Sequence, residues 1–222
     1  MPNHTPAPTM APDKSLSLIY IPGWQYAPEN SHIEHSPMGQ AALDKLQAID
    51  RQQALLSESG IIIFDAATHP QTSPKEVIKQ LDMLVSSERQ KGLDVGLIGH
   101  AIGGYYGAYM AERYHLPAIL INPLIKAYKS LLLADMLEDH PGLLTLAQEQ
   151  LKALETGTTH PDSIMLMLQK GDLLQDYQQA LAYYPHCQQI VLNGGHHGFA
   201  DLADWVDAMM GFFRHYYEHK QE

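Results

Sequence analysis

The sequence is poor in cysteine, in basic residues and in long apolar runs, and each shortage excludes a class of protein. Cys187 is the one cysteine in 222 residues, so no internal disulfide framework can form. The 14 basic and 25 acidic side chains give a formal net charge of −11, which repels nucleic acid and anionic lipid. No apolar run reaches the ~20 residues of a membrane helix. We therefore expect a cytoplasmic protein without nucleic-acid or membrane partners.

The length predicts one domain. A chain of 222 residues buries roughly 70% of its unfolded surface on folding, so no metal or disulfide is needed for stability. Residues 1–15 carry four prolines and no apolar run, which is typical of a loose tail and not of a secretory signal. We expect the single domain to span residues 16–222.

Short apolar runs alternate with segments of helical periodicity. Strands are predicted over 16–22, 61–65, 95–99, 118–123, 164–168 and 189–192. Helices are predicted over 39–59, 74–91, 102–114, 175–184 and 201–217. This alternation indicates an α/β fold, a mostly parallel sheet with helices on both faces.

Residues 124–160 interrupt the alternation. They contain no strand pattern but show helical spacing of leucines, in LLLADML and LLTLAQEQLKAL. A helical cap or lid above the strand ends and an ordinary long crossover connection both fit this pattern.

The sharpest motif is LIGHAIGG at 97–104, which follows a predicted strand and opens a predicted helix. It resembles the nucleophile elbow of α/β-hydrolases, G-x-S-x-G. The glycines let strand and helix approach closely, so that the central side chain projects from the turn. The helix N-terminus behind it offers backbone N–H groups and partial positive charge to an oxyanion.

The central residue of this motif is Ala101 where a hydrolase has serine, and a methyl group cannot attack a carbonyl. An engineered Ser→Ala variant, which we favour, and natural loss of the nucleophile both explain it. A dinucleotide-binding turn is a weaker alternative. Such a turn needs G-x-G-x-x-G on the first strand, and here the middle glycine is absent and the turn lies mid-chain.

The other members of a catalytic triad follow in the chain order of this fold, acid and then histidine. Asp172 comes after the predicted strand 164–168, and His197 lies in a glycine-rich loop after 189–192. We expect Asp172 to orient the ring of His197, which would act as the base. Asp176 is the reserve acid and His196 the reserve base.

Backbone N–H groups near the elbow are the candidates for an oxyanion hole. Ile102 follows the nucleophile position, and Trp24 lies in the loop after the first strand, where Gly23 lets the chain turn close to the site. Gly23, His100 and Tyr105 are predicted to line the substrate site, although Tyr105 also fits simple packing against the sheet.

The 13 histidines raise the question of a metal site. His215 and His219 share a helix face, but zinc needs three or four convergent ligands, and neither an HExxH motif nor a cysteine cluster occurs. We expect no metal and no cofactor.

Three segments together resemble the small bacterial YqiA-type esterases of the α/β-hydrolase superfamily. They are GHAIGGYY at 99–106 with its continuation to Pro123, GDLLQDYQQALAYY at 171–184, and GGHHGF at 194–199. The resemblance implies an α/β-hydrolase fold and hydrolysis of small acyl esters or thioesters without a cofactor. It places the nucleophile at Ala101, the acid at Asp172 and the base at His197.

The chain departs from that family in four places. Serine is replaced at Ala101, Pro22 stands where the family usually has histidine, and His196 stands where it has an Asn-like residue. The segment 26–39 is longer than usual, which affects the expected acyl pocket. We therefore predict a serine-type esterase or thioesterase whose present chain is inactive. The alternative is a natural pseudo-hydrolase that binds a ligand or serves as a scaffold.

Overall fold

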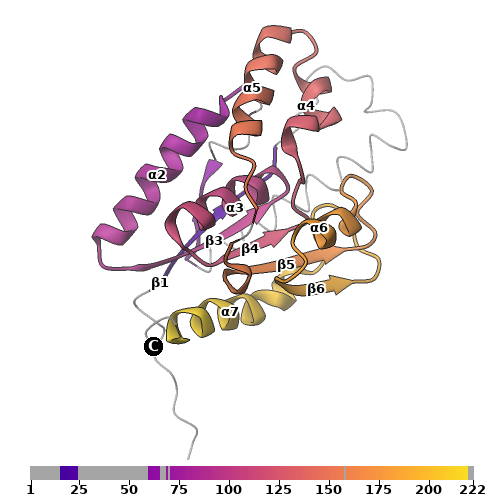
Figure 1. Ribbon diagram of the computed structural model, residues 1–222. Helices are drawn as coiled ribbons and strands as arrows, with labels where there is room; N and C mark the ends of the chain where they lie inside the picture. Colours follow the sequence, from indigo (N-terminus) through magenta and orange to yellow (C-terminus); the bar gives the residue numbers. More distant parts are fainter. Residues whose placement is uncertain (1–15, 25–59, 66–68, 70, 158, 220–222) are drawn as a thin grey trace, which may run out of the picture.

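The computed structural model describes residues 16–24, 60–65, 69, 71–157 and 159–219 (Figure 1). The expected tail over 1–15, the expected helix over 39–59 and the segment 26–39 lie outside the described residues.

Six strands form one sheet in the order β2-β1-β3-β4-β5-β6, and every neighbouring pair is parallel. All six match the strands predicted from apolar runs, although the edge strand β2 is shorter than the run that predicted it. Their bounds are β1 Leu16–Ile21, β2 Ile62–Ile63, β3 Asp94–His100, β4 Ala118–Ile121, β5 Ile164–Gln169 and β6 Gln188–Leu192.

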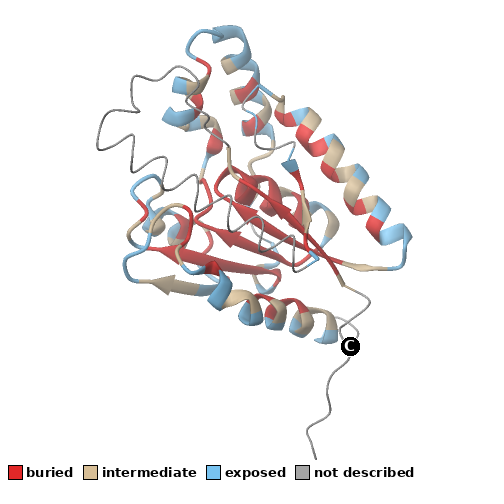
Figure 2. Cartoon of the chain, turned by 180° about the vertical axis from the view of Figure 1, so that it is seen from behind, coloured by how far each residue is buried: buried red, intermediate tan, exposed pale blue. Residues whose placement is uncertain are grey.

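The central strands are buried on both faces (Figure 2). Successive side chains of a strand point to opposite sides, and in β3 both Leu97 and Ile98 are fully buried. Leu97 belongs to the core under α2 and α3, whereas Ile98 packs in a second core with Phe213 of α7. A strand covered on both faces has no polar side to show, which explains the continuous apolar runs of the sequence.

Helices cover the two faces unequally. Among the helices that contribute to the first core are α2 (Pro74–Gln90), α3 (Ile102–Tyr114) and α6 (Tyr177–Tyr183), whereas α7 (Val206–His219) lies across the other face (Figure 1). Each corresponds to a predicted helix. The prediction over 201–217 differs in one respect, because its first turn, Leu202–Trp205, is a 3-10 helix.

The interruption over 124–160 is helical, as expected. It holds α4 (Leu131–Met136) and α5 (Pro141–Ala153), which lie above α3 in Figure 1, with α5 beside the upper end of α2. Its attachment to the domain is specific, because Tyr105 in α3 donates a hydrogen bond to the Leu151 carbonyl at 2.9 Å. Movement of the insertion as a lid stays a prediction.

The strand order reverses direction at β1. The chain passes from β1 to β2 on one side and then to β3 on the other, so the switch point, where open α/β sheets have their crevice, lies between the carboxyl ends of β1 and β3. Ligands of open α/β sheets bind at such switch points. Gly23 follows β1 and Ala101 follows β3, which places both at this crevice.

Two glycines set the distance between α3 and the sheet. A Cβ at Gly103 would stand 1.9 Å from the Ile21 carbonyl oxygen, and a Cβ at Gly99 would stand 2.4 Å from the Gly103 carbonyl oxygen. Both distances are shorter than any tolerated contact, so only glycine permits the helix to begin this close to β1 and β3. The elbow therefore depends on both residues.

We expect Gly103→Ala to lower the free energy of unfolding by about 3 kcal/mol or more, because neither the methyl group nor the strand backbone has room to move. Gly107→Ala in the same helix is the matched control. Its new methyl group would meet nothing closer than 3.7 Å, and alanine favours a helix by about 0.5–1 kcal/mol. Urea unfolding measures the free energy of unfolding of both variants. Equal values for Gly103→Ala and Gly107→Ala would contradict the close approach of α3 to the sheet.

Candidate active site

Ala101 occupies a strained turn between β3 and α3. Its φ of 53° and ψ of −117° lie in a region that residues with a Cβ rarely adopt. Its N–H donates to the Ile121 carbonyl at 3.0 Å, and its own carbonyl accepts from Leu124 N at 3.0 Å. These two bonds join the elbow to the last residue of β4 and to the turn that follows β4. They hold the elbow in the conformation that the motif predicted.

Asp172 lies in the loop after β5 with its carboxylate almost fully buried. One oxygen, Oδ1, accepts hydrogen bonds from the backbone N–H groups of Leu174 at 2.8 Å and Gln175 at 3.1 Å. The other oxygen, Oδ2, lies 2.8 Å from Nδ1 of His197. The acid and the base that the sequence predicted are therefore in direct contact.

The electrostatics of this pair determine which tautomer His197 adopts. Burial by itself raises the pKa of Asp172, but the hydrogen bond from His197 and those from the two backbone N–H groups outweigh burial and lower that pKa below its ordinary value. Asp172 is thus ionised at neutral pH and can only accept. Nδ1 of His197 therefore carries the proton of this hydrogen bond, so that in the uncharged tautomer Nε2 is the nitrogen with a free lone pair.

Two buried amides that the sequence analysis missed hold the histidine loop. The side chain of Gln169 accepts from the N–H groups of His196 and Ala200, both at 2.9 Å. Asn122 donates to the carbonyls of His196 at 3.3 Å and His197 at 3.1 Å, while its Oδ1 accepts from Gln169 N at 2.9 Å. Both amides come at the ends of predicted strands. A polar amide at the end of an apolar run was the signal by which the sequence could have shown them.

The reserve acid Asp176 and the reserve base His196 make other contacts. Asp176 begins α6, where its Oδ1 accepts from Gln178 N at 2.9 Å as an N-cap. His196 binds Gln169 through its backbone, and its Nδ1 is buried without a partner among the described residues. Neither takes part in the contact between Asp172 and His197.

The residues predicted around the elbow lie at the crevice or beneath it. A Cβ built on Gly23 would be 3.2 Å from the Ala101 methyl, so the segment that leads to Trp24 touches the elbow. Ile102 is the first residue of α3, and its N–H has no acceptor within the helix itself. Tyr105 is buried and bonded to the insertion, a position that fits packing. His100 is also buried, with Nε2 2.7 Å from the His197 carbonyl.

Two further features concern only the residues that the structure describes. They contain no group of three or more histidine, cysteine or acidic side chains placed to hold a metal ion. Within the same residues no helix has the length and apolar character needed to cross a bilayer.

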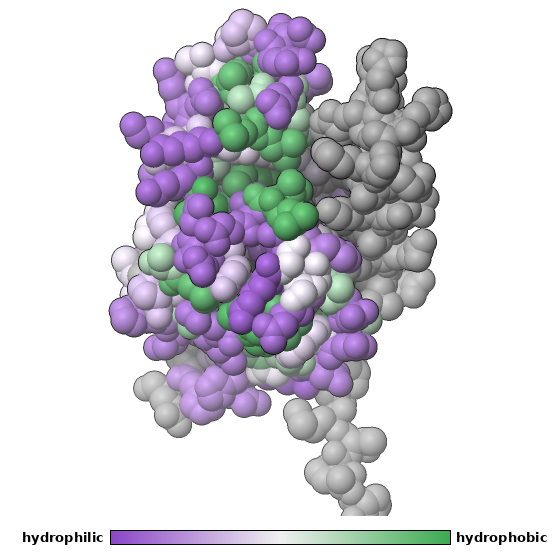
Figure 3. Space-filling model, turned by 90° about the vertical axis from the view of Figure 1, so that its right-hand side faces the viewer, coloured by the Kyte–Doolittle hydropathy of each residue, from purple (hydrophilic) through white to green (hydrophobic). Residues whose placement is uncertain are grey.

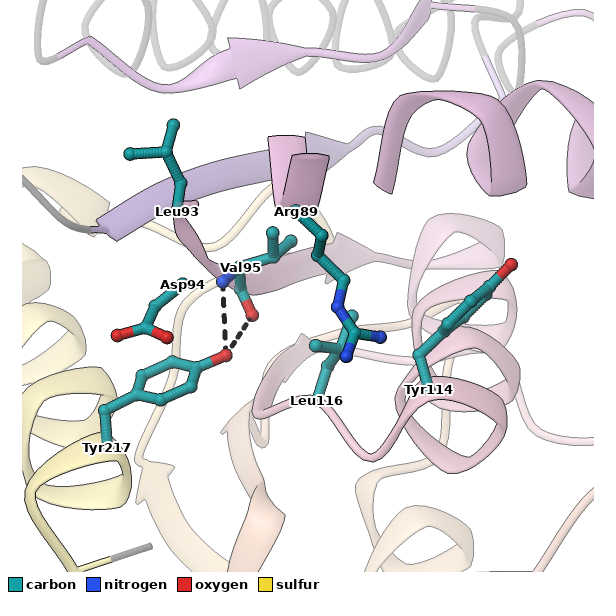
Figure 4. A pocket seen from close by; sticks show the side chains of 7 residues that line it. All are labelled: Arg89, Leu93, Asp94, Val95, Tyr114, Leu116 and Tyr217. Carbon is teal, nitrogen blue, oxygen red and sulfur yellow. Dashed lines mark hydrogen bonds between the residues drawn. The ribbon is translucent and has the colours of Figure 1, made fainter. Parts of the chain in front are cut away.

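A separate hollow of about 300 Å³ lies at the amino end of β3, remote from the elbow at the carboxyl end. In Figure 4 the Tyr217 hydroxyl reaches the strand, where it donates to the Val95 carbonyl at 2.6 Å and accepts from Val95 N at 3.2 Å. The hollow is lined by Arg89, Leu93, Asp94, Val95, Tyr114, Leu116 and Tyr217. It does not include the predicted acid or base.

The sequence profile of the uncharacterised protein family UPF0227 matches residues 17–214. The chain belongs to this family. The match confirms the resemblance to YqiA-type esterases, and it includes the elbow, Asp172 and His197.

Solved structures of other proteins share the fold. A putative hydrolase from Agrobacterium vitis is 14% identical, with a TM-score of 0.59 over 90% of this chain and 89% of its own. Est1E from Butyrivibrio proteoclasticus is 15% identical, with a TM-score of 0.58 over 95% and 90%. An esterase from Pyrococcus furiosus is 12% identical, with a TM-score of 0.54 over 90% and 82%. The chain therefore has an α/β-hydrolase fold, and its activity has to be argued from the site itself.

We expect Asp172→Asn to lower the free energy of unfolding at pH 7 by about 1.5–3 kcal/mol, the contribution of a hydrogen bond to a charged group. A carboxyl whose pKa is depressed by folding stabilises the fold above its ordinary pKa of 3.8, and this stabilisation is lost as the pH falls through the folded-state value. The difference in the free energy of unfolding between Asp172→Asn and the parent should thus shrink in acid. Denaturant unfolding at several pH values measures it.

Asp176→Asn is the matched control, because asparagine caps a helix as well as aspartate does. We expect it to leave the stability unchanged. A deficit in Asp172→Asn that is the same at pH 7 and in strong acid would show that ionisation of Asp172 is not its source.

Proposed function

We propose that this site is that of a serine-type esterase or thioesterase acting on small acyl esters, with the nucleophile replaced by Ala101. The observation that carries the proposal is the 2.8 Å contact between Asp172 and His197 at the carboxyl edge of the sheet. A buried carboxylate that fixes the tautomer of a histidine beside a strained elbow is the arrangement that activates a serine hydroxyl.

With serine at position 101, the reaction follows from these positions. The hydroxyl oxygen attacks the acyl carbon while Nε2 of His197 takes its proton, and the oxyanion forms hydrogen bonds with the N–H groups of Trp24 and Ile102. His197 then returns the proton to the leaving alcohol or thiol, which leaves an acyl-enzyme. A water molecule that gives its proton to His197 releases the acid in the same way.

Apolar surface beside the site supports an acyl substrate. Leu173 and Leu174, directly after Asp172, are 88% and 59% exposed, and Leu131 on α4 is 81% exposed. Figure 3 views the side that carries α4 and α6, where green apolar patches lie among purple polar residues in the upper part and again lower down. Exposed leucines at the mouth of a site offer a favourable environment to a hydrocarbon chain.

A pseudo-hydrolase is the second candidate, and Ala101 itself is the observation that favours it. A chain with alanine at the elbow retains the crevice and the two N–H groups, and it would bind an ester or its acid product with very slow turnover. On this account the protein serves as a ligand-binding or scaffold protein.

We expect Ala101→Ser to raise the hydrolysis of short p-nitrophenyl esters by at least about 10³-fold, since a complete triad is worth more than that in kcat. The gain should vanish when His197→Ala is added to the Ala101→Ser chain. Steady-state kinetics of the three proteins measure this. A serine variant no faster than the parent, while an ester or acid still raises the melting temperature, would favour the pseudo-hydrolase.

A further inference from the structure

His100 lies between the elbow and the base, and it was predicted to contact substrate. The structure gives it little access to a substrate, because only 3% of the residue is exposed. Its ring lies 5.0 Å from the ring of His197, measured between centroids, at an angle of 40°. Its Nε2 lies 2.7 Å from the His197 carbonyl oxygen. A carbonyl oxygen only accepts, so Nε2 of His100 carries the proton of this bond.

The carbonyl of His197 thus accepts two hydrogen bonds from buried side chains. One comes from His100 at the end of β3, and the other comes from Asn122 at the end of β4 at 3.1 Å. The ring of His197 is held separately by Asp172. The base is therefore fixed at its carbonyl and at its Nδ1, from three different strand ends.

We infer that His100 is a positioning residue, which fixes the distance between position 101 and the catalytic base by donating its Nε2 proton to the His197 carbonyl. His100 directly precedes Ala101 in the chain, so this bond joins the elbow itself to the histidine loop. The inference rests on the proposed function and assigns to His100 a role other than substrate contact.

The chemistry of imidazole suits this role. Burial, together with the neighbouring His197, lowers the pKa of His100 to about 3, so the ring of His100 is uncharged at neutral pH. It therefore supplies a hydrogen-bond donor without a charge. A lysine or arginine in its place would repel the imidazolium that forms on His197 during each proton transfer.

Three substitutions, made in the Ala101→Ser chain, separate the hydrogen bond from the bulk of the ring. His100→Gln keeps a donor where Nε2 stands. His100→Phe keeps a ring of similar size without a donor. His100→Asn is smaller than the native residue and its amide is too short to reach the His197 carbonyl, so it serves if the phenylalanine variant does not fold. The melting temperature of each variant checks that the fold is intact.

We expect kcat for a short p-nitrophenyl ester to fall about 10- to 100-fold in the phenylalanine and asparagine variants, the loss that a small displacement of a catalytic group causes. KM should stay within about twofold, because His100 does not touch substrate. The glutamine variant should retain kcat to within about threefold, since its donor replaces the one removed.

A second measurement uses the chain with Ala101 and needs no activity. Proton NMR follows the Nδ1 proton of His197, assigned by its absence in His197→Gln, and its exchange with water. We expect exchange at least about 10-fold faster in His100→Phe and His100→Asn than in the parent, because a displaced ring shares its proton less well with Asp172. His100→Gln should protect the proton as the parent does.

The outcomes separate this inference from the proposed esterase. If Ala101→Ser is inactive but the exchange rates differ as expected, the esterase proposal fails, while the hydrogen bond from His100 is still shown to hold the ring of His197 against Asp172. Unchanged kcat and exchange in a folded phenylalanine or asparagine variant would overturn the positioning role. So would equal losses in the glutamine and phenylalanine variants, or a rise in KM at constant kcat, which is the result of substrate contact.

Discussion

The approach of α3 to the ends of β1 and β3 is the constraint on which the site depends. Gly99 and Gly103 allow backbone to meet backbone there, at distances that no side chain tolerates. Because the helix begins so close to the strand, the residue between them takes a positive φ and projects at the crevice where the strand order reverses. Each of the other components is arranged around that turn, including the loop after β1 and the histidine loop.

The groups around position 101 are in place although the side chain of residue 101 is only a methyl group. A residue with a Cβ in this region of φ and ψ costs about 1–3 kcal/mol, and Ala101 adopts it without a hydroxyl to display. The buried pair of Asp172 and His197 and the two amides that hold the histidine loop are equally intact. The strained turn and the buried acid–histidine pair fit the nucleophile or bound ligand that we propose for position 101.

Buried polar side chains bond the histidine loop at several points, in addition to the apolar packing of Phe199 in the second core. Gln169 is 3% exposed and Asn122 is 2% exposed, and each bonds the histidine loop at more than one point. Such groups are costly to bury unless their partners are all present, so a loop held by them has one low-energy position. A fixed position is what the proposed proton transfer by His197 requires.

Local patterns in the sequence predicted the six strands, the described helices, the elbow and the order of Asp172 and His197, because apolar runs, glycine turns and chain order all act over short distances. The bounds of β2 were less accurate, since an edge strand of two residues has little pattern to read. The roles of His100, Asn122 and Gln169 could be seen only in the tertiary structure. Each is an ordinary residue at the end of its own strand, and its partner lies 27 to 97 positions away in the chain. The sequence alone thus determined which candidate side chains the site contains. Only the folded chain decided which groups hold them in place, because these hydrogen bonds form only after parallel strands bring their carboxyl ends together.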